Sequence, residues 1–334
     1  MSHETPKSST FNGLLAVDID TFKRVNRDIT FDVYLKLSED NVCHVFSRSS
    51  GLDYRRLAQY IQKGVRELYI RNEDEPAFRK FSDRTSEAIF ADPSVSPEKK
   101  IATLLNMTEQ NLSELFSRID VNDESAQSTR RVVGNYLKLL TENPKSLATL
   151  LKLASHGDYL YYHSIAVSVF SIFVAKATGR FGEKNLEQIG MGGFLHDVGC
   201  TQLPKEIIES PYEFTQEQWS EMHQHSKLGL AMLEGAPSVP QEVRYMVYQH
   251  HEAEDGTGYP NALKGSAIFY PAKIVAIADG LSALISRRPH RGAFTLEEAL
   301  EILEQQSGKR YDAELIRVVS SIFSSQAGAR KRET

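Results

Sequence analysis

The feature that most constrains this chain is the occurrence of histidine and aspartate inside segments that are otherwise apolar. Of its 10 histidines, only His3 and His44 precede residue 150. Histidine is the commonest metal ligand and a frequent acid–base group. A buried carboxylate is costly unless it is paired or binds a metal. The later part of the chain must therefore fold so that these side chains meet partners in its interior.

Two apolar segments carry the first of these side chains. Residues 159–177 predict a helix whose apolar face includes His163. Residues 186–199 predict a second helix, with His196 and Asp197 in apolar surroundings. Two adjacent glycines in that helix are unfavourable by propensity and indicate close approach of another backbone. A core histidine or an Asp–His hydrogen bond is the alternative to metal binding at both segments.

Two later segments supply further histidines. Residues 215–218 resemble a capping box, and the helix it opens turns His225 inward and His223 towards solvent. His250 and His251 precede a glycine-rich turn. Adjacent residues differ by about 100° around a helix, so both can face one site only near a helix end.

An aspartate interrupts the last apolar segment. Residues 270–285 predict a nearly continuous apolar helix that contains Asp279. A solvated surface position is the alternative, but Ala276, Ile277 and Leu281 surround this acid in the sequence. We therefore expect Asp279 to face the same interior cluster.

The first part of the chain has a different pattern. Residues 31–37 and 42–46 alternate between apolar and polar, which is the period of a strand, and residues 65–70 predict a third strand. Residues 53–64 predict a short helix between them, with Asp53 as its N-cap and Gly64 as its stop. No catalytic motif occurs here, so a regulatory or partner-binding role and a passive structural role are both open.

These patterns predict an α+β chain of two domains, a small α/β domain followed by an all-α helical bundle. We expect disorder over residues 1–10, the α/β domain over 11–75, a helical connector over 76–135, the helical domain over 136–322 and a flexible tail over 323–334.

Composition excludes several classes of protein. The net charge of −5 gives no basis for binding DNA or RNA. No apolar run approaches a membrane span, and the first residues lack the apolar core of a secretion signal. The two cysteines, Cys43 and Cys200, are far apart in sequence and indicate no disulfide framework. A cytoplasmic location is expected.

Taken in order, these motifs resemble the HD-GYP family, a branch of the HD superfamily of metal-dependent phosphohydrolases. The matching elements lie within about residues 140–320. They are His196-Asp197, the His225 segment to Gly229, the His250-His251-Glu252 to Pro260 element, Asp279, and Arg288-Pro289. A lone His-Asp pair is weak evidence, but this ordered series is specific.

The resemblance implies an all-α domain that hydrolyses cyclic di-GMP to pGpG or GMP by a metal-activated hydroxide at a binuclear centre. The family's metals are usually iron and sometimes manganese, which suits imidazole and carboxylate ligands. Mapped by motif, one metal would bind His163, His196 and Asp279, and the other His225, His250 and His251. Asp197 would bridge the two metals and so act as the catalytic carboxylate.

Several positions depart from the family pattern. Cys200 occupies the place of a lysine that helps to hold substrate phosphate, and its loss should weaken binding or turnover. Tyr159 replaces a glutamate that binds a third metal in some relatives, which favours two metals here. Ser282 and His290 replace an aspartate and a tyrosine. Arg288 is retained as a phosphate contact, with plain surface as its alternative.

The loop at Gly258, Tyr259 and Pro260 is intact. In the family it lies near the substrate and is a contact for diguanylate cyclase (GGDEF) partners, and a purely structural turn is the alternative.

Three functions fit the sequence. The first is an active cyclic di-GMP phosphodiesterase, which the complete ligand series supports. The second is a weakly active or inactive relative that acts as a cyclic di-GMP sensor or protein-interaction module, which Cys200 supports. The third is a hydrolase of another phosphoester. The sequence leaves open the oligomeric state, with a homodimer as one form.

Overall fold

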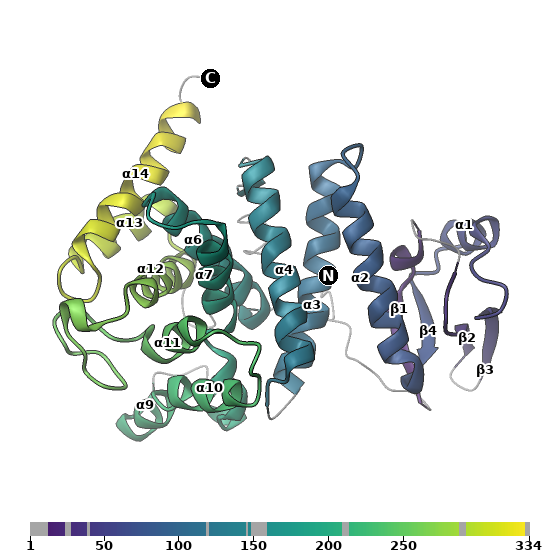
Figure 1. Cartoon of the computed structure of the whole chain (residues 1–334), viewed down its shortest axis with the longest axis horizontal. Helices are drawn as coiled ribbons and strands as arrows, with labels where there is room; N and C mark the ends of the chain where they lie inside the picture. The colour runs from purple at the N-terminus through teal and green to yellow at the C-terminus, as the bar shows by residue number, and fades with distance from the viewer. Residues whose placement is uncertain are drawn as a thin grey trace. The chain divides into compact units, whose positions relative to one another are not determined.

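The computed structural model has the predicted architecture, a small unit with a four-stranded sheet followed by a helical unit (Figure 1). The chain divides into two compact units at residues 103 and 104. The ranges that the structure describes are 13–23, 28–38, 41–117, 120–144, 146–147, 159–208, 214–286 and 292–330. The expected disorder over residues 1–10 falls outside these ranges.

All pairings in the sheet of the N-terminal unit are antiparallel, and the strand order is β1-β4-β2-β3. The strands are β1 (Leu14–Asp18), β2 (Val33–Ser38), β3 (Asn41–Phe46) and β4 (Glu67–Arg71). The last three confirm the predicted strands. Strand β1, which pairs along its whole length with β4, was not predicted, because its residues do not alternate between apolar and polar.

The sheet is covered by an aromatic core. Helix α1 (Tyr54–Gln62) begins after Asp53, whose side chain accepts hydrogen bonds from two backbone N–H groups of the first turn, as the sequence predicted. Helix α2 (Glu75–Ala91) contributes Phe78 and Phe81, which pack on Phe22. The apolar core of this unit therefore draws on both the sheet region and α2.

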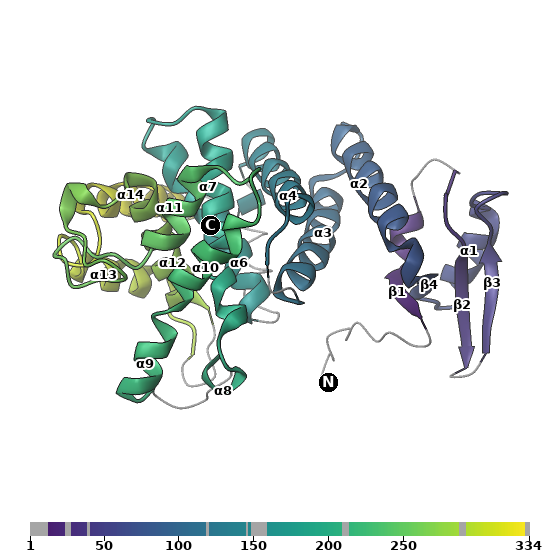
Figure 2. The same cartoon turned by 60° about the horizontal axis from the view of Figure 1, so that its bottom comes forward.

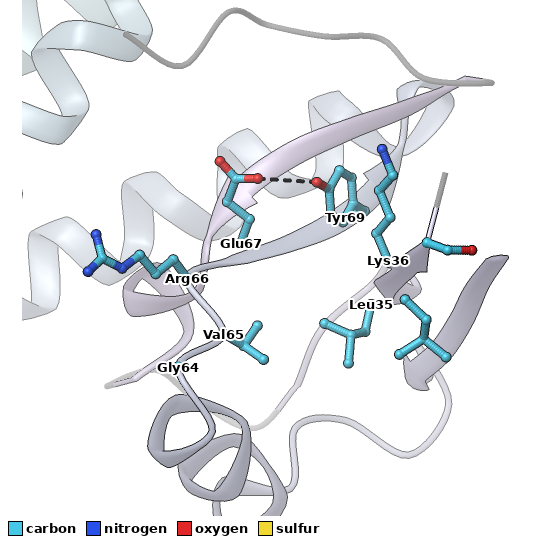
Figure 3. Close-up of a pocket in the computed structure, with 9 residues that line it drawn as sticks. Leu35, Lys36, Gly64, Val65, Arg66, Glu67 and Tyr69 are labelled. Carbon is cyan, nitrogen blue, oxygen red and sulfur yellow. Dashed lines mark hydrogen bonds between the residues drawn. The ribbon is translucent and has the colours of Figure 1, made fainter. Parts of the chain in front are cut away.

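Strands β2 and β4 lie side by side, with Tyr34 paired with Tyr69. Beyond this pair lies an open hollow lined partly by Leu35 and Val65 (Figure 3). Tyr69 donates its hydroxyl hydrogen bond to Glu67 beside it. The lining residues include no histidine or cysteine, so the hollow has none of the ligand chemistry found in the helical unit.

Helices α3 (Pro97–Ser117) and α4 (Asp123–Glu142) follow α2 in the range of the predicted connector. Helix α4 begins with a reciprocal capping box between Asn122 and Ser125. Helix α4 also contacts α7 (Glu183–Leu195). A side chain at Gly190 on α7 would come within 2.6 Å of Val133 on α4, so glycine allows this close contact.

Helices α6 (Tyr159–Ala177), α7 and α12 (Tyr270–Ile285) pack against one another at the centre of the helical unit (Figures 1 and 2). The remaining elements of this unit are η3 (Val198–Gln202), α8 (Lys205–Ile208), α9 (Gln216–Met222), α10 (His225–Glu234), α11 (Gln241–Gln249), η4 (Gly265–Ala267), α13 (Leu296–Gln305) and α14 (Ala313–Arg330). The N-terminal unit adds η1 (Ile19–Phe22) and η2 (Asn72–Asp74). Helix α14 continues into the segment for which a flexible tail was expected.

The adjacent glycines of α7 meet neighbouring helices, as the sequence predicted. A side chain at Gly193 would lie 2.9 Å from the carbonyl oxygen of Val167 on α6. A side chain at Gly192 would lie 2.6 Å from the sulfur of Met246 on α11. This packing brings the C-terminal end of α7 close to both helices.

One predicted helix is divided in two. The capping box at Thr215 opens α9 as expected, but α9 ends at Met222 and α10 begins at His225. The predicted solvent-facing position of His223 is therefore wrong. Its ring is partly buried and stacks on Tyr259, with centroids 3.9 Å apart. The prediction assumed one continuous helix, because the spacing of apolar residues continues across the break between Met222 and His225.

Within the described residues, none of the helices combines the length and apolar character needed to cross a membrane.

Candidate metal centre

The structure brings all seven predicted ligand side chains together. Two overlapping groups place one ligand atom per residue within 4.8 Å of one another. One group contains His163, His196 and Asp197, and the other contains Asp197, His225, His250 and His251. Asp279 joins the first group, because its Oδ1 lies 3.2 Å from Nε2 of His163.

Helix ends position most of these side chains. His163 lies on α6, His196 at the end of α7, Asp197 in the next turn, His225 at the start of α10, His250 and His251 directly after α11, and Asp279 within α12. The adjacent pair His250 and His251 thus follows a helix end, as its spacing required. Four of the five histidines and Asp279 are buried in the described structure.

Three histidines share one hydrogen-bond arrangement. Nδ1 of His196, His225 and His250 lies 2.8, 2.7 and 2.8 Å from a backbone carbonyl oxygen three residues earlier. A nitrogen that donates to a carbonyl must carry the ring proton. Their Nε2 atoms therefore present lone pairs to the centre of the cluster.

These lone pairs indicate a cation site. Nε2 of His225 and Nε2 of His250 lie only 3.2 Å apart. Two lone pairs at this distance repel unless a proton or a metal ion lies between or beside them. Nitrogens that bind one metal at about 2.1 Å adopt a comparable separation. Nε2 of His196 is buried and has no partner with hydrogen-bond geometry, so it too is free to bind a cation.

The carboxylate of Asp197 faces both groups. Its Oδ2 lies 3.1 Å from Nε2 of His196 and 3.8 Å from Nε2 of His163. Its Oδ1 lies 3.4 Å from Nε2 of His225 and 3.8 Å from Nε2 of His250. One oxygen therefore serves each group of histidines, which is the arrangement of a carboxylate shared by two cations.

The electrostatics of the cluster also favour positive charge. Burial would raise the pKa of Asp197, but the charges of His196, His225 and His163 hold it well below its usual range. Burial would lower the pKa of His196, but Asp197 and Asp279 outweigh it and raise the pKa to about 9. In the absence of a metal, Nε2 of His196 therefore holds a proton, which a bound metal ion would displace.

Elsewhere in the cluster, burial and then the charges of His196 and His225 lower the pKa of His250 to about 3. A neutral imidazole is the form that binds metals.

A second carboxylate orders the loop beside the cluster. Glu252 is buried and accepts hydrogen bonds of 2.8 Å from the backbone N–H groups of Asn261 and Leu263. Gly258 packs against the backbone of His251 so closely that any side chain there would clash. The Tyr259 ring lies 4.7 Å from the ring of His251. The loop therefore presents Tyr259 at the cluster.

The substrate positions have different outcomes. Cys200 lies in η3, buried, and its backbone N–H donates to the carbonyl of Asp197. Burial and then the Asp197 charge raise the pKa of its thiol, so it supplies no cation for a phosphate. Arg288 and His290 lie outside the described residues.

Sequence reasoning missed the role of Ser282. This buried residue lies 3.0 Å from Nδ1 of His163 through its hydroxyl oxygen. It therefore orients the one ligand-type histidine on α6, a role that metal ligands commonly need from a neighbour. The spacing carried a signal, because Ser282 follows Asp279 by one helical turn and faces the same side.

Comparison with known proteins supports this interpretation of the helical unit. Residues 171–315 match the family model described as HD domain. The chain is similar to the cyclic di-GMP phosphodiesterase response regulator RpfG of Xanthomonas campestris, at 36% identity over 42% of this chain and 37% of the relative. It is also similar to the 3'3'-cGAMP-specific phosphodiesterase 1 of Vibrio cholerae, at 31% identity over 54% of this chain and 42% of the relative. The chain thus spans less than half the length of these curated relatives.

A solved structure shares the fold of both units. Bd1817, an HDG"Y"P protein from Bdellovibrio bacteriovorus, matches with a TM-score of 0.67 and 21% identity. The match covers 93% of this chain and 99% of that one. The domain match thus shows an HD domain over residues 171–315, and the order of the motifs resembles that of the HD-GYP family.

Proposed function

We propose that this chain is a metal-dependent phosphodiesterase that hydrolyses cyclic di-GMP. The single observation that carries the proposal is the convergence of seven ligand-type side chains around the shared carboxylate of Asp197. The similarity to RpfG supports the choice of cyclic di-GMP, and the similarity to a cGAMP-specific phosphodiesterase supports a cyclic dinucleotide as the substrate class.

The donor set divides between two metal ions. The residues that would hold the first ion are His163, His196 and Asp279, and those for the second are His225, His250 and His251. Iron suits these ligands best, with manganese as the alternative. When bound, a metal pair lowers the pKa of water and offsets the charge on the phosphate.

The chain's own residues prepare this chemistry. Backbone carbonyls fix the tautomer of three histidines, so their Nε2 atoms point inward before any ion arrives. Each oxygen of Asp197 faces one of the two groups of histidines, so this carboxylate links the two groups. Glu252 holds the loop that presents Tyr259 beside His251, where it can exclude water from one side of the cluster.

The test is incubation of the full chain, loaded with iron or manganese, with cyclic di-GMP. We expect pGpG or GMP to accumulate, and metal analysis to give about two ions per chain. His250→Ala should release metal and abolish turnover, whereas His223→Ala should retain the full metal content. Equal metal loss in both variants would overturn the ligand assignment.

A second candidate function is a weakly active relative that binds cyclic di-GMP as a sensor. The observation that favours it is Cys200, a neutral buried thiol at the position of the family's lysine. For this function we expect binding of cyclic di-GMP without measurable turnover, and activity gained in Cys200→Lys. Rapid turnover by the unchanged chain would exclude it.

A further inference from the structure

A series of aromatic rings leads outward from the candidate metal centre. Tyr259 contacts His251, with ring centroids 4.7 Å apart. His223 stacks on Tyr259 at 3.9 Å, with an angle of 23° between the ring planes. Trp219 follows, 5.7 Å from His223. We call Trp219, His223 and Tyr259 the aromatic series.

Trp219 contacts Phe214, with ring centroids 5.2 Å apart, but this packing leaves much of its ring exposed. Trp219 is 50% exposed, and helix α9, which carries it, buries none of its residues. A scattered exposed apolar side chain is ordinary on a protein surface. Trp219 differs because it is continuous, ring by ring, with a cluster of metal-ligand chemistry.

Stacking aromatic rings are a common recognition surface for nucleobases. Every base has a flat π face, so this contact is strong and tolerant of base identity. The inner end of the series meets the cluster that would bind a phosphate, and the outer end is exposed. This order, phosphate position then aromatic rings, matches the order of groups in a nucleotide.

We propose that Trp219 is a stacking platform for a purine base of the substrate whose phosphate lies at the metal centre. His223, whose ring plane is tilted by 47° to that of Trp219, lies between this platform and the cluster. The proposal rests on the proposed function and extends it by assigning the base subsite. Tyr259 links the two positions, since its ring contacts both His223 and His251. Trp219 is the outer contact, and His223 sets the distance between the base and the cluster.

The composition of the chain offers a direct test, because Trp219 is its single tryptophan. The metal-loaded full chain is titrated with GMP and with ribose 5-phosphate, which lacks the base, while tryptophan fluorescence is followed. GMP should quench Trp219 and ribose 5-phosphate should not. Binding of GMP, shown by calorimetry, without quenching would overturn the platform, as would equal quenching by both ligands.

Variants provide a second measurement. Trp219→Ala should raise the KM for cyclic di-GMP roughly tenfold, the scale of one lost base stack, with little change in kcat. Trp219→Phe should keep most of the affinity. Tyr245→Ala is the matched control, because Tyr245 is 44% exposed and contacts Phe269 rather than the aromatic series. Metal content, measured for each variant, shows that the centre is intact.

The outcomes separate this proposal from the proposed function. Hydrolysis of cyclic di-GMP with an unchanged KM in Trp219→Ala would reject the platform and keep the phosphodiesterase. Quenching by GMP in a chain that does not hydrolyse cyclic di-GMP would keep the platform and reject the phosphodiesterase. An equal effect of Tyr245→Ala on KM would also reject the platform.

Discussion

The two units of this chain bury different kinds of side chain. The N-terminal unit surrounds Phe22 and Phe31 with other apolar residues, and the buried residues of its core cluster are all apolar. The helical unit buries imidazoles and carboxylates where its helices meet. The first arrangement is stable by itself, because apolar burial is favourable without a partner. The second needs a cation, because buried polar groups are costly when unpaired.

The difference extends to the charged groups of the two units. In the N-terminal unit, Arg48 pairs with Asp32 and with the buried Asp74. Each of these carboxylates therefore has a cationic partner from the unit itself and needs no metal. Asp197, by contrast, has all its close ionic neighbours inside the cluster. We therefore expect metal, chelator and ligand variants to act on the helical unit alone.

The largest expected effect is that of Asp197→Asn. Substitution of a residue that only hydrogen-bonds to a metal ligand lowers metal affinity or activity by up to about 100-fold. Asp197 faces both groups of histidines itself, so loss of its charge should have a larger effect. Metal analysis and turnover of cyclic di-GMP measure this. Asp32→Asn is the matched control in the N-terminal unit and should leave the metal content unchanged. Retention of both metals in Asp197→Asn would contradict the shared-carboxylate assignment.

A substitution in the apolar core tests whether the N-terminal unit is stable independently of the metal centre. Phe22 is fully buried, so Phe22→Ala should lower the free energy of unfolding of the N-terminal unit by about 3–5 kcal/mol. The metal content of the folded protein should not change. Hydrogen exchange in β1 and β4 reports the first quantity, and metal analysis reports the second. A loss of metal would show that the centre depends on the sheet.

Metal removal should have a smaller effect, and only on the helical unit. A ligand present at about 100 times its dissociation constant stabilises the folded state by about 2.7 kcal/mol. Chelation should therefore lower the unfolding temperature reported by Trp219 fluorescence by roughly 5–10 °C. Exchange protection in the N-terminal strands is the internal control. Equal loss of exchange protection in both units would contradict the expectation that the metal stabilises only the helical unit.

Local patterns predicted much of the fold. The capping groups Asp53 and Thr215 and the nearly continuous apolar segment of α12 predicted the positions of these helices correctly. Strand β1 was not predicted, because its pairing with β4 is a long-range contact that its own residues do not encode. The break between Met222 and His225 escaped because periodicity continues numerically across it.

The candidate site was predictable to a different extent. Histidine and aspartate in apolar helices indicated a cluster, and the structure brings all the named ligand residues together. Roles that depend on contacts between distant segments were not predictable. The stacking of His223 on Tyr259 joins two segments through tertiary packing, and no local spacing reports it. The same holds for the hydrogen bond between Ser282 and His163.

The smallest expected effect tests that last contact. Ser282→Ala removes the hydroxyl that orients His163, so metal affinity should fall by about tenfold, the lower range for such a neighbour. Competition with a chelator measures it. Ser168→Ala is the matched control, because Ser168 is also a buried serine of the helical unit, and its hydroxyl donates to the carbonyl of Gly190 on α7. Ser168→Ala should cost about 1 kcal/mol of stability and leave metal affinity unchanged. If both variants retain full metal affinity, the hydroxyl of Ser282 is not needed, and packing on α6 alone orients His163.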